Sequence, residues 1–186
     1  MSTVSTVIVR LSAPEELLAH AEEFAALLAE VVADGASLGF VRPFGRADAA
    51  AWWAARAPAL ADGGLTVWAA RSGGRLVGTV SLALAPEQNG RHRGHIAKLM
   101  VHPGARGRGT AAALLATAER AAAAAGVTLL LLDTETGSAA EYLYRSAGWT
   151  KYGEVPDYAS DPAGTLQPAS FFHKFLSRDI HGTEPP

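Results

Sequence analysis

The sequence has 186 residues, the size of one globular domain, and 49% of them are hydrophobic, which is enough to build a core and excludes wholesale disorder. Sixteen lysines and arginines stand against eighteen acidic residues, so the formal net charge is −2, and we expect neither nucleic acid nor an anionic membrane as the main partner. The absence of cysteine excludes disulfides, cysteine-based zinc sites and a covalent cysteine intermediate, and we expect no metal ion in the site. Apolar stretches are too short for a membrane helix and the N-terminus lacks a signal-peptide pattern, so we expect a cytoplasmic protein.

The first third of the chain predicts one strand followed by two helices. Residues 6–11 are rich in β-branched side chains, and apolar residues then recur at helical spacing up to Asp34-Gly35, which ends the first helix. A loop leads to a second helix at about residues 46–61, which Gly63-Gly64 stops.

The rest of the chain predicts a mixed sheet. Three strands in series at residues 65–71, 76–84 and 91–101 form an antiparallel meander, because short turn sequences separate them. A helix at residues 110–125 then leads to a leucine-rich strand at 127–133, and such a crossover makes the flanking strands parallel. A further helix, opened by Ser138 and Glu141 as a capping box, precedes two last strands at 150–155 and 169–175. We expect one α/β domain at residues 1–178 and a loose tail at 179–186.

The loop after the third meander strand carries the strongest chemical signal. Residues 102–111 read HPGARGRGTA, in which glycines allow close approach of the backbone to a ligand and two arginines add cationic donors. The helix that follows presents unpaired N–H groups at its first turn, and these favour an anion. The segment therefore predicts a pyrophosphate site, and the competing interpretation is a glycine-rich connection with solvated arginines.

Three phosphate-binding templates compete for this loop. The Walker template requires a lysine where the chain has Thr110, so nucleotide hydrolysis is disfavoured. The dinucleotide fingerprint fits Gly107, Gly109 and Ala112, with Asp133 about 20 residues further on, but the preceding strand ends too far upstream for its tight turn. The third template, arginine-x-x-glycine-x-glycine or alanine, is satisfied by Arg106, Gly109 and Ala111.

With the strand His95–Val101 before this loop and Leu143–Trp149 (LYRSAGW) after the next strand, the chain resembles the GNAT superfamily of acetyl-CoA-dependent N-acetyltransferases. The resemblance covers nearly the whole length and is strongest from Lys98 to Trp149. A closer similarity to the tabtoxin-resistance acetyltransferases, which acetylate a β-lactam amino acid, rests on residues 35–40, 98–101, 105–109 and 132–135 with Gly137-Ser138.

The resemblance implies a sheet of six or seven strands, with helices on both faces and a splayed parallel pair that admits the pantetheine arm of acetyl-CoA, the co-substrate. Backbone groups of Leu99, Met100 and Val101 would bind that arm, and an N–H near Met100 would stabilise the oxyanion. Where related proteins often have an asparagine that contacts the cofactor, this chain has Gly137, and Ser138 is the expected substitute. The pyrophosphate would be bound by Arg106, Gly107, Arg108, Gly109, Thr110 and Ala111.

The resemblance aims Tyr144 at the sulfur as the proton donor to the leaving thiolate; the alternative is a half-buried aromatic residue with a local partner. An imidazole can exchange a proton near neutral pH, so His95 is one candidate base, and the alternative is a surface histidine at a polar hairpin edge. Asp133 ends a buried strand beside the expected acetyl site and is a second candidate, against a turn aspartate. Glu135 is a weaker candidate of the same kind.

We expect the acceptor pocket near residues 37–40, with Phe40, Trp53 and Tyr158 as its walls and Asp133 and Glu135 as polar contacts, although such aromatics are more often core. The expected reaction is direct acetyl transfer to the primary amine of a small molecule, with an amino-acid-like antibiotic, and hence resistance, as one candidate. The alternatives are a protein N-terminus or lysine as acceptor, a non-catalytic acyl-CoA-binding module and, more remotely, a dinucleotide-dependent enzyme. A homodimer is one candidate for the oligomeric state.

Overall fold

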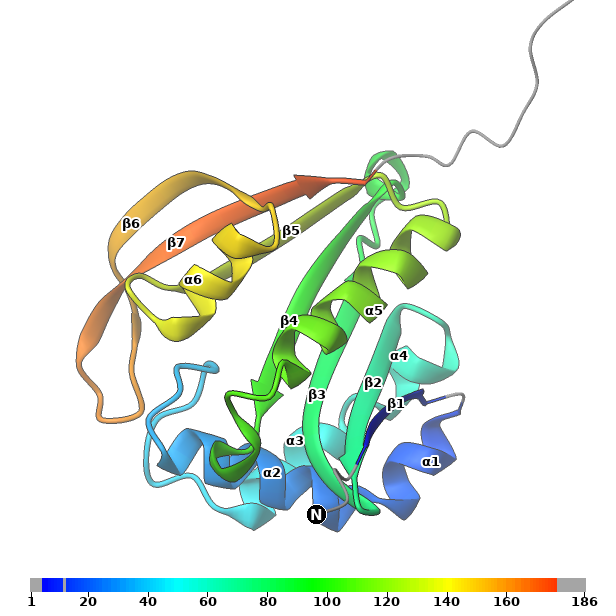
Figure 1. The fold of residues 1–186 in the computed structure, drawn as a ribbon, viewed down its shortest axis with the longest axis vertical. Helices are drawn as coiled ribbons and strands as arrows, with labels where there is room; N and C mark the ends of the chain where they lie inside the picture. The colour runs from blue at the N-terminus through cyan, green and yellow to red at the C-terminus, as the bar shows by residue number, and fades with distance from the viewer. Residues whose placement is uncertain (1–4, 12, 177–186) are drawn as a thin grey trace, which may run out of the picture.

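The computed structural model describes residues 5–11 and 13–176. They form one mixed sheet in the strand order β1-β2-β3-β4-β5-β7-β6, as Figure 1 shows, so the predicted α/β fold with six or seven strands is confirmed. The expected tail at residues 179–186 lies outside the described residues. The strands are β1 (Thr6–Arg10), β2 (Leu65–Ser72), β3 (Arg75–Leu84), β4 (Arg93–Val101), β5 (Leu129–Glu135), β6 (Thr150–Ser160) and β7 (Leu166–Phe175).

The sheet has two antiparallel parts joined by one parallel pair. β2, β3 and β4 pair in sequence as the predicted meander, and β1 pairs with β2 at its outer edge. The crossover through α5 (Thr110–Ala124) makes β5 parallel to β4, and β7 inserts antiparallel between β5 and β6. β6 and β7 form a longer hairpin than predicted, because pairing continues beyond residue 155 to Ser160↔Leu166.

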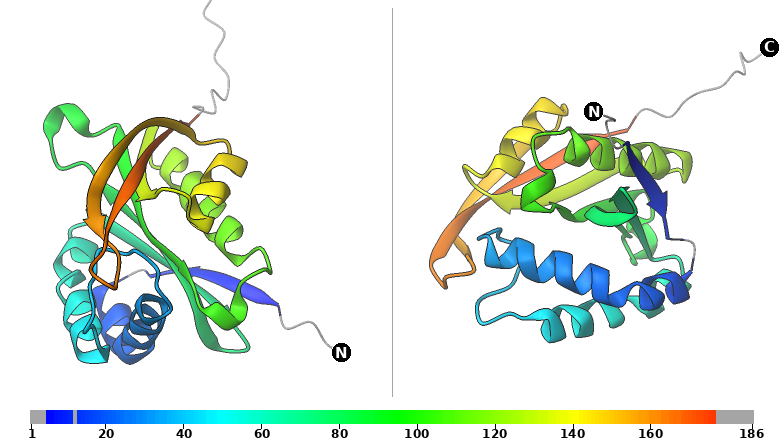
Figure 2. Two further views of the ribbon diagram at one scale, coloured as in Figure 1. Left: turned by 90° about the vertical axis from the view of Figure 1, so that its left-hand side faces the viewer. Right: turned by 60° about the horizontal axis from the view of Figure 1, so that its bottom comes forward.

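Helices cover both faces of the sheet, as the two views in Figure 2 show. α5 packs on β2, β3 and β4, and α6 (Ala139–Ser146) packs on β5, so these two helices share one face. The opposite face of the meander is covered by α1 (Pro14–Ala19), α2 (Ala21–Ala33), α3 (Arg46–Ala54) and α4 (Ala57–Ala61). None of the helices in the described part of the chain is long and apolar enough to cross a bilayer.

Two helices predicted as continuous are each broken in the structure. The first is interrupted at His20, whose φ of −109° and ψ of 16° lie outside the helical range, so α1 and α2 are separate. The second ends at Ala54 and resumes at Ala57. Pro58 explains this second break, because its ring clashes with a carbonyl four residues earlier and it has no N–H to donate there.

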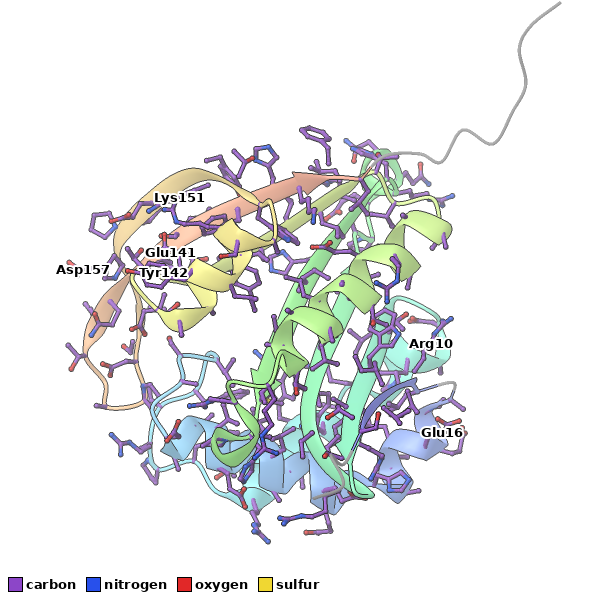
Figure 3. The ribbon with its side chains drawn as sticks, in the orientation of Figure 1. Arg10, Glu16, Glu141, Tyr142, Lys151 and Asp157 are labelled. Atoms are coloured by element: carbon purple, nitrogen blue, oxygen red, sulfur yellow. The ribbon has the colours of Figure 1, made fainter. Side chains whose placement is uncertain are left out.

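A buried carboxylate anchors α6 to the sheet. Glu141 is 6% exposed, and its carboxylate accepts a hydrogen bond from the Gly137 N–H and forms ion pairs with Arg145 and Lys151. Ser170 on β7 donates to the same carboxylate, and Figure 3 labels Glu141 and Lys151 in this region. The pKa of Glu141 is lowered to about 2, and the hydrogen bond from the Gly137 N–H is the largest cause. The capping box predicted at this helix is formed in part, since the Glu141 N–H donates to the Ser138 hydroxyl.

We expect Glu141→Gln to lower the free energy of unfolding by about 2 kcal/mol at neutral pH, because Arg145, Lys151 and the buried Ser170 lose their anionic partner. The native pKa lies below the usual 4.5, so the stabilisation is complete above that pH and declines as the pH falls toward 2. Denaturant unfolding from pH 7 to pH 2.5 should therefore show the two proteins converging in acid. Glu154→Gln, which removes an exposed partner of Lys151, is the control. A difference that stays constant down to pH 2.5 would contradict this assignment.

Candidate functional site

The parallel strands β4 and β5 separate where the sheet would otherwise continue. They pair at Arg93↔Leu129, Gly94↔Leu130 and His95↔Leu131 and then diverge, as Figure 1 shows. The part of β4 beyond His95 therefore has backbone groups with no strand partner on its β5 side. An extended polar ligand can take the place of the missing strand, since buried backbone groups require hydrogen-bond partners.

β4 contains a bulge at this opening. Thr79 of β3 lies opposite Met100 and Ser81 lies opposite Ala97, so β4 carries one residue more than β3 between these pairs. Lys98 adopts a φ of +50° there, and the buried Thr79 hydroxyl donates to its carbonyl at 3.0 Å. A bulge re-aims the backbone that follows, which here is Leu99 to Val101.

A first cavity of about 580 Å³ runs along the gap between β4 and β5, a size suited to a cofactor or small ligand. It extends from the start of α5 past both strands to α6 and the C-terminal end of α2. The predicted cofactor residues that line it are Leu99, Met100, Val101, Arg106, Gly107, Gly109, Thr110, Ala111 and Ser138.

The β4–α5 loop, residues 102–109, ends in an open cradle of N–H groups. Gly107 and Gly109 have φ values of +74° and +78°, a left-handed conformation that a side chain would strain, and no atom lies within 4 Å of a Cβ built on either. The backbone N–H groups of residues 107–112 donate no hydrogen bond within the described residues. This run of free donors at a helix N-terminus fits a diphosphate.

The Arg106 side chain is turned toward α2 instead of the open cradle. Its Nη1 forms a 2.6 Å ion pair with Asp34 and its Nε donates to the Val101 carbonyl. His102 makes a parallel contact, because its Nε2 lies 3.0 Å from the Glu30 carboxylate. In this structure the Arg106 side chain therefore holds the loop against α2, and its contact with the pyrophosphate stays a prediction. Arg108 is exposed and has no side-chain partner within the described residues.

Tyr144 reaches the first cavity from α6. It is 6% exposed and packs against Trp149 and Phe172, with ring centroids at 5.9 and 6.1 Å. Burial raises the pKa of the Tyr144 hydroxyl, and the negative charge of Asp133 raises it further. The hydroxyl therefore stays protonated at neutral pH and can act as a proton donor.

A second cavity of about 310 Å³ meets the same gap between β4 and β5. The α2–α3 loop, residues 35–45, forms one wall and the β6–β7 hairpin another. The two walls touch, because the Arg42 N–H and guanidinium both donate to the Pro162 carbonyl. Residues common to both cavities are Ser37, Leu38, Ile96, Ala97, Lys98, Asp133, Thr134 and Glu135.

His95 and Asp133 face each other across the last paired position of β4 and β5. His95 Nε2 lies 3.5 Å from an Asp133 carboxylate oxygen, and each side chain is less than half exposed. The pKa of Asp133 is held below its usual value, chiefly by the hydrogen bond from His95 and to a smaller extent by the positive charge of Lys98. Burial acts in the opposite direction. Asp133 is therefore an anion that can orient the imidazole.

The predicted aromatic walls are only partly where the sequence placed them. Tyr158 and Glu135 line the second cavity. Trp53 does not: it is fully buried against Phe24 in the core beneath α2 and α3, as its place on the inner face of a helix explains. Phe40 lines neither cavity and stacks on Phe44 at 4.3 Å.

Two residues with no assigned role in the sequence analysis prove to shape the site. Asp34 belongs to the predicted helix stop, and Lys98 falls within the strand predicted at residues 91–101. A lysine in a strand is usually solvated, and no local pattern shows that Lys98 takes a positive φ. The partner of Asp34 lies 72 residues away, so no sequence spacing could reveal it.

Together, the N–H cradle, the open strand edge and the buried tyrosine define a site for a ligand with a diphosphate at one end and an extended amide-containing arm at the other. This is the shape of coenzyme A, and a thioester carried on the arm would lie near the meeting point of the two cavities. The fold and site thus define an acyltransferase.

A family model for the acetyltransferase (GNAT) family matches residues 34–149, and the chain belongs to this family. It is an acetyl-CoA-dependent N-acetyltransferase. A putative acetyltransferase from Salmonella typhimurium, solved with its cofactor acetyl-CoA, is 20% identical with a TM-score of 0.72, and the match covers 96% of each chain.

Two further solved structures share the fold. A ribosomal-protein-alanine N-acetyltransferase from Brucella melitensis is 25% identical with a TM-score of 0.71, and the match covers 91% of this chain and 99% of that one. A putative phosphinothricin N-acetyltransferase is 16% identical with a TM-score of 0.75, covering 93% and 99%. One of these names denotes a protein acceptor and the other a small molecule, so the fold alone leaves the acceptor open.

We expect Arg106→Ala to weaken acetyl-CoA binding about tenfold, because the β4–α5 loop loses its contacts with both Asp34 and Val101. Asp34→Asn should weaken binding two- to fivefold, since an exposed ion pair contributes little. Calorimetric titration with acetyl-CoA measures both, with Glu30→Gln, which frees His102, as a parallel variant. Tighter binding by Asp34→Asn would show instead that Asp34 competes with the phosphates for a directly binding Arg106.

Proposed function

We propose that the protein acetylates the primary amine of a small, amino-acid-like molecule, with an antibiotic of this kind, and thus self-resistance or detoxification, as the leading case. The observation that carries the proposal is the second cavity, which is small and whose two walls, the α2–α3 loop and the β6–β7 hairpin, are joined by the contact between Arg42 and the Pro162 carbonyl. An extended polypeptide acceptor needs an open groove, whereas this cavity has the volume of a small ligand. The sequence similarity to tabtoxin-resistance acetyltransferases supports the same class.

Acetyl-CoA supplies the acetyl group as a thioester, which an unprotonated amine can attack. In this proposal N–H groups near Met100, re-aimed by the bulge, stabilise the charge that develops on the carbonyl oxygen. The cradle at residues 107–111 and Arg108 bind the diphosphate. The Ser138 hydroxyl already has partners in the protein, because it accepts a hydrogen bond from the Glu141 N–H and lies 3.3 Å from the Thr134 hydroxyl. We therefore expect Ser138 to contribute less to cofactor binding than the cradle does.

Proton transfer is divided between the two sides of the gap. His95, oriented by Asp133, accepts the proton of the attacking amine in the second cavity, directly or through water. Tyr144 donates a proton to the departing thiolate in the first cavity. Burial keeps the hydroxyl protonated at neutral pH, so its O–H is available to the thiolate as a donor.

A thiol-release screen tests the function. Acetyl-CoA is incubated with the protein and with amino acids, β-lactam amino acids, aminoglycosides, polyamines or peptides with a free N-terminus. We expect release above the hydrolysis background with amino-acid-like amines only. Thiol release with peptides alone would contradict the small-molecule acceptor and indicate a protein acceptor. Tight binding of acetyl-CoA without thiol release for any amine would indicate a non-catalytic module.

We expect Tyr144→Phe and His95→Gln each to lower kcat about 100-fold with little change in acetyl-CoA affinity, as befits groups that act on protons. Tyr142→Phe is a matched control, because Tyr142 lies on the same helix and is 67% exposed. His92→Gln serves the same purpose for His95. If Tyr144→Phe keeps full turnover between pH 6 and pH 9, the tyrosine is not the proton donor.

A further inference from the structure

Lys98 occupies a position whose backbone conformation disfavours a side chain. Its φ of +50° is left-handed, a backbone conformation that is strained for a residue other than glycine. Glycine would relieve that strain, so the lysine side chain is expected to have a use that offsets it. The mechanism proposed above assigns it none.

The side chain crosses from the bulge in β4 to the α2–α3 loop. Its Nζ donates to the Leu38 carbonyl at 2.7 Å and lies 5.2 and 5.1 Å from the ring centroids of Phe40 and Trp52. These contacts fix the ammonium group in place and leave two of its three N–H donors without a hydrogen bond in the described structure. The group is therefore preorganised and only partly satisfied.

Lys98 lines both cavities at the point where they meet. On the other side of the gap, β5 contributes Asp133 and Glu135 to the same cavities, and the Glu135 side chain forms no hydrogen bond or ion pair within the described residues. The second cavity thus has a cationic side on β4 and an anionic side on β5. Such a pair of poles matches a molecule that carries both an amine and a carboxylate.

We propose that Lys98 selects acceptors that carry a carboxylate close to the reacting amine, by pairing its free N–H groups with that carboxylate. The amine then lies toward Asp133 and His95, where its proton is removed. The inference rests on the proposed function and narrows its acceptor to α-amino-acid-like zwitterions.

The electrostatics of Lys98 agree with this geometry. Partial burial, followed by the positive charge of Arg56, lowers the pKa of the Lys98 ammonium, and Asp133 only partly opposes this. A desolvated cation without a contacting anion is stabilised by an incoming carboxylate. A lysine suits the task because its ammonium is a compact charge that one carboxylate oxygen can approach while Leu38 remains bound.

The experiment compares L-α-amino acids with their α-carboxamides as acceptors, and adds amines that lack a carboxylate. Thiol release gives kcat/KM for each acid and its amide, in the wild type and in Lys98→Gln. The glutamine is chosen because its amide N–H can still donate to the Leu38 carbonyl while the charge is lost. Arg91→Gln removes one exposed positive charge at the far end of β4 and controls for net charge.

We expect the wild type and Arg91→Gln to prefer the acid over its carboxamide at least tenfold, mainly through KM, and Lys98→Gln to lose this preference. A preference that survives in Lys98→Gln would overturn the assignment to Lys98. Equal rates for acids, carboxamides and carboxylate-free amines in the wild type would overturn the acceptor class and leave acetyl transfer standing. No thiol release from any amine, with acetyl-CoA still raising Tm, would overturn the proposed function and this inference with it.

Discussion

The divergence of β4 and β5 is the constraint on which the rest of the site depends. Hydrogen bonding between them ends after His95 and Leu131, although both strands continue. The bulge at Lys98 accompanies this separation, and the Thr79 hydroxyl satisfies the carbonyl that the bulge takes out of the ladder. An open strand edge inside a sheet is costly unless something pairs with it. A ligand with amide groups along an extended arm meets that need, so the gap makes the sheet incomplete without its co-substrate.

α2 links the two sides of the site. Near its C-terminal end, Glu30 and Asp34 hold the β4–α5 loop through His102 and Arg106. The next residue, Gly35, begins the α2–α3 loop that walls the second cavity. One helix end therefore sets the position of both the diphosphate cradle and the acceptor wall. Exposed ion pairs are individually weak, so this link places two loops without locking them.

Local patterns in the sequence predicted most of the elements, although the helix break at Pro58 was missed. Alternation in the meander and the leucine run after α5 predicted the strands β2 to β5 and the parallel crossover, because each pattern depends on neighbouring residues. The side-chain directions of Arg106 and Trp53 could not be predicted in the same way. Both depend on partners from distant segments, Asp34 and Phe24 respectively, and an arginine beside a phosphate loop or a tryptophan on a helix is compatible with either orientation.

The arrangement of the cavities favours direct transfer over a covalent acyl-enzyme. The first cavity holds Tyr144 and the N–H cradle, and the second holds His95, so the proposed donor and the proposed acceptor of protons lie in different cavities. The acceptor amine, which must lose a proton, and the thiolate, which must gain one, are then present together only when both substrates are bound. The chain has no cysteine to carry an acetyl group between half-reactions. The ammonium group of Lys98 at this junction is fixed by the Leu38 carbonyl and two aromatic rings, which favours its use as a charge over its use as a nucleophile.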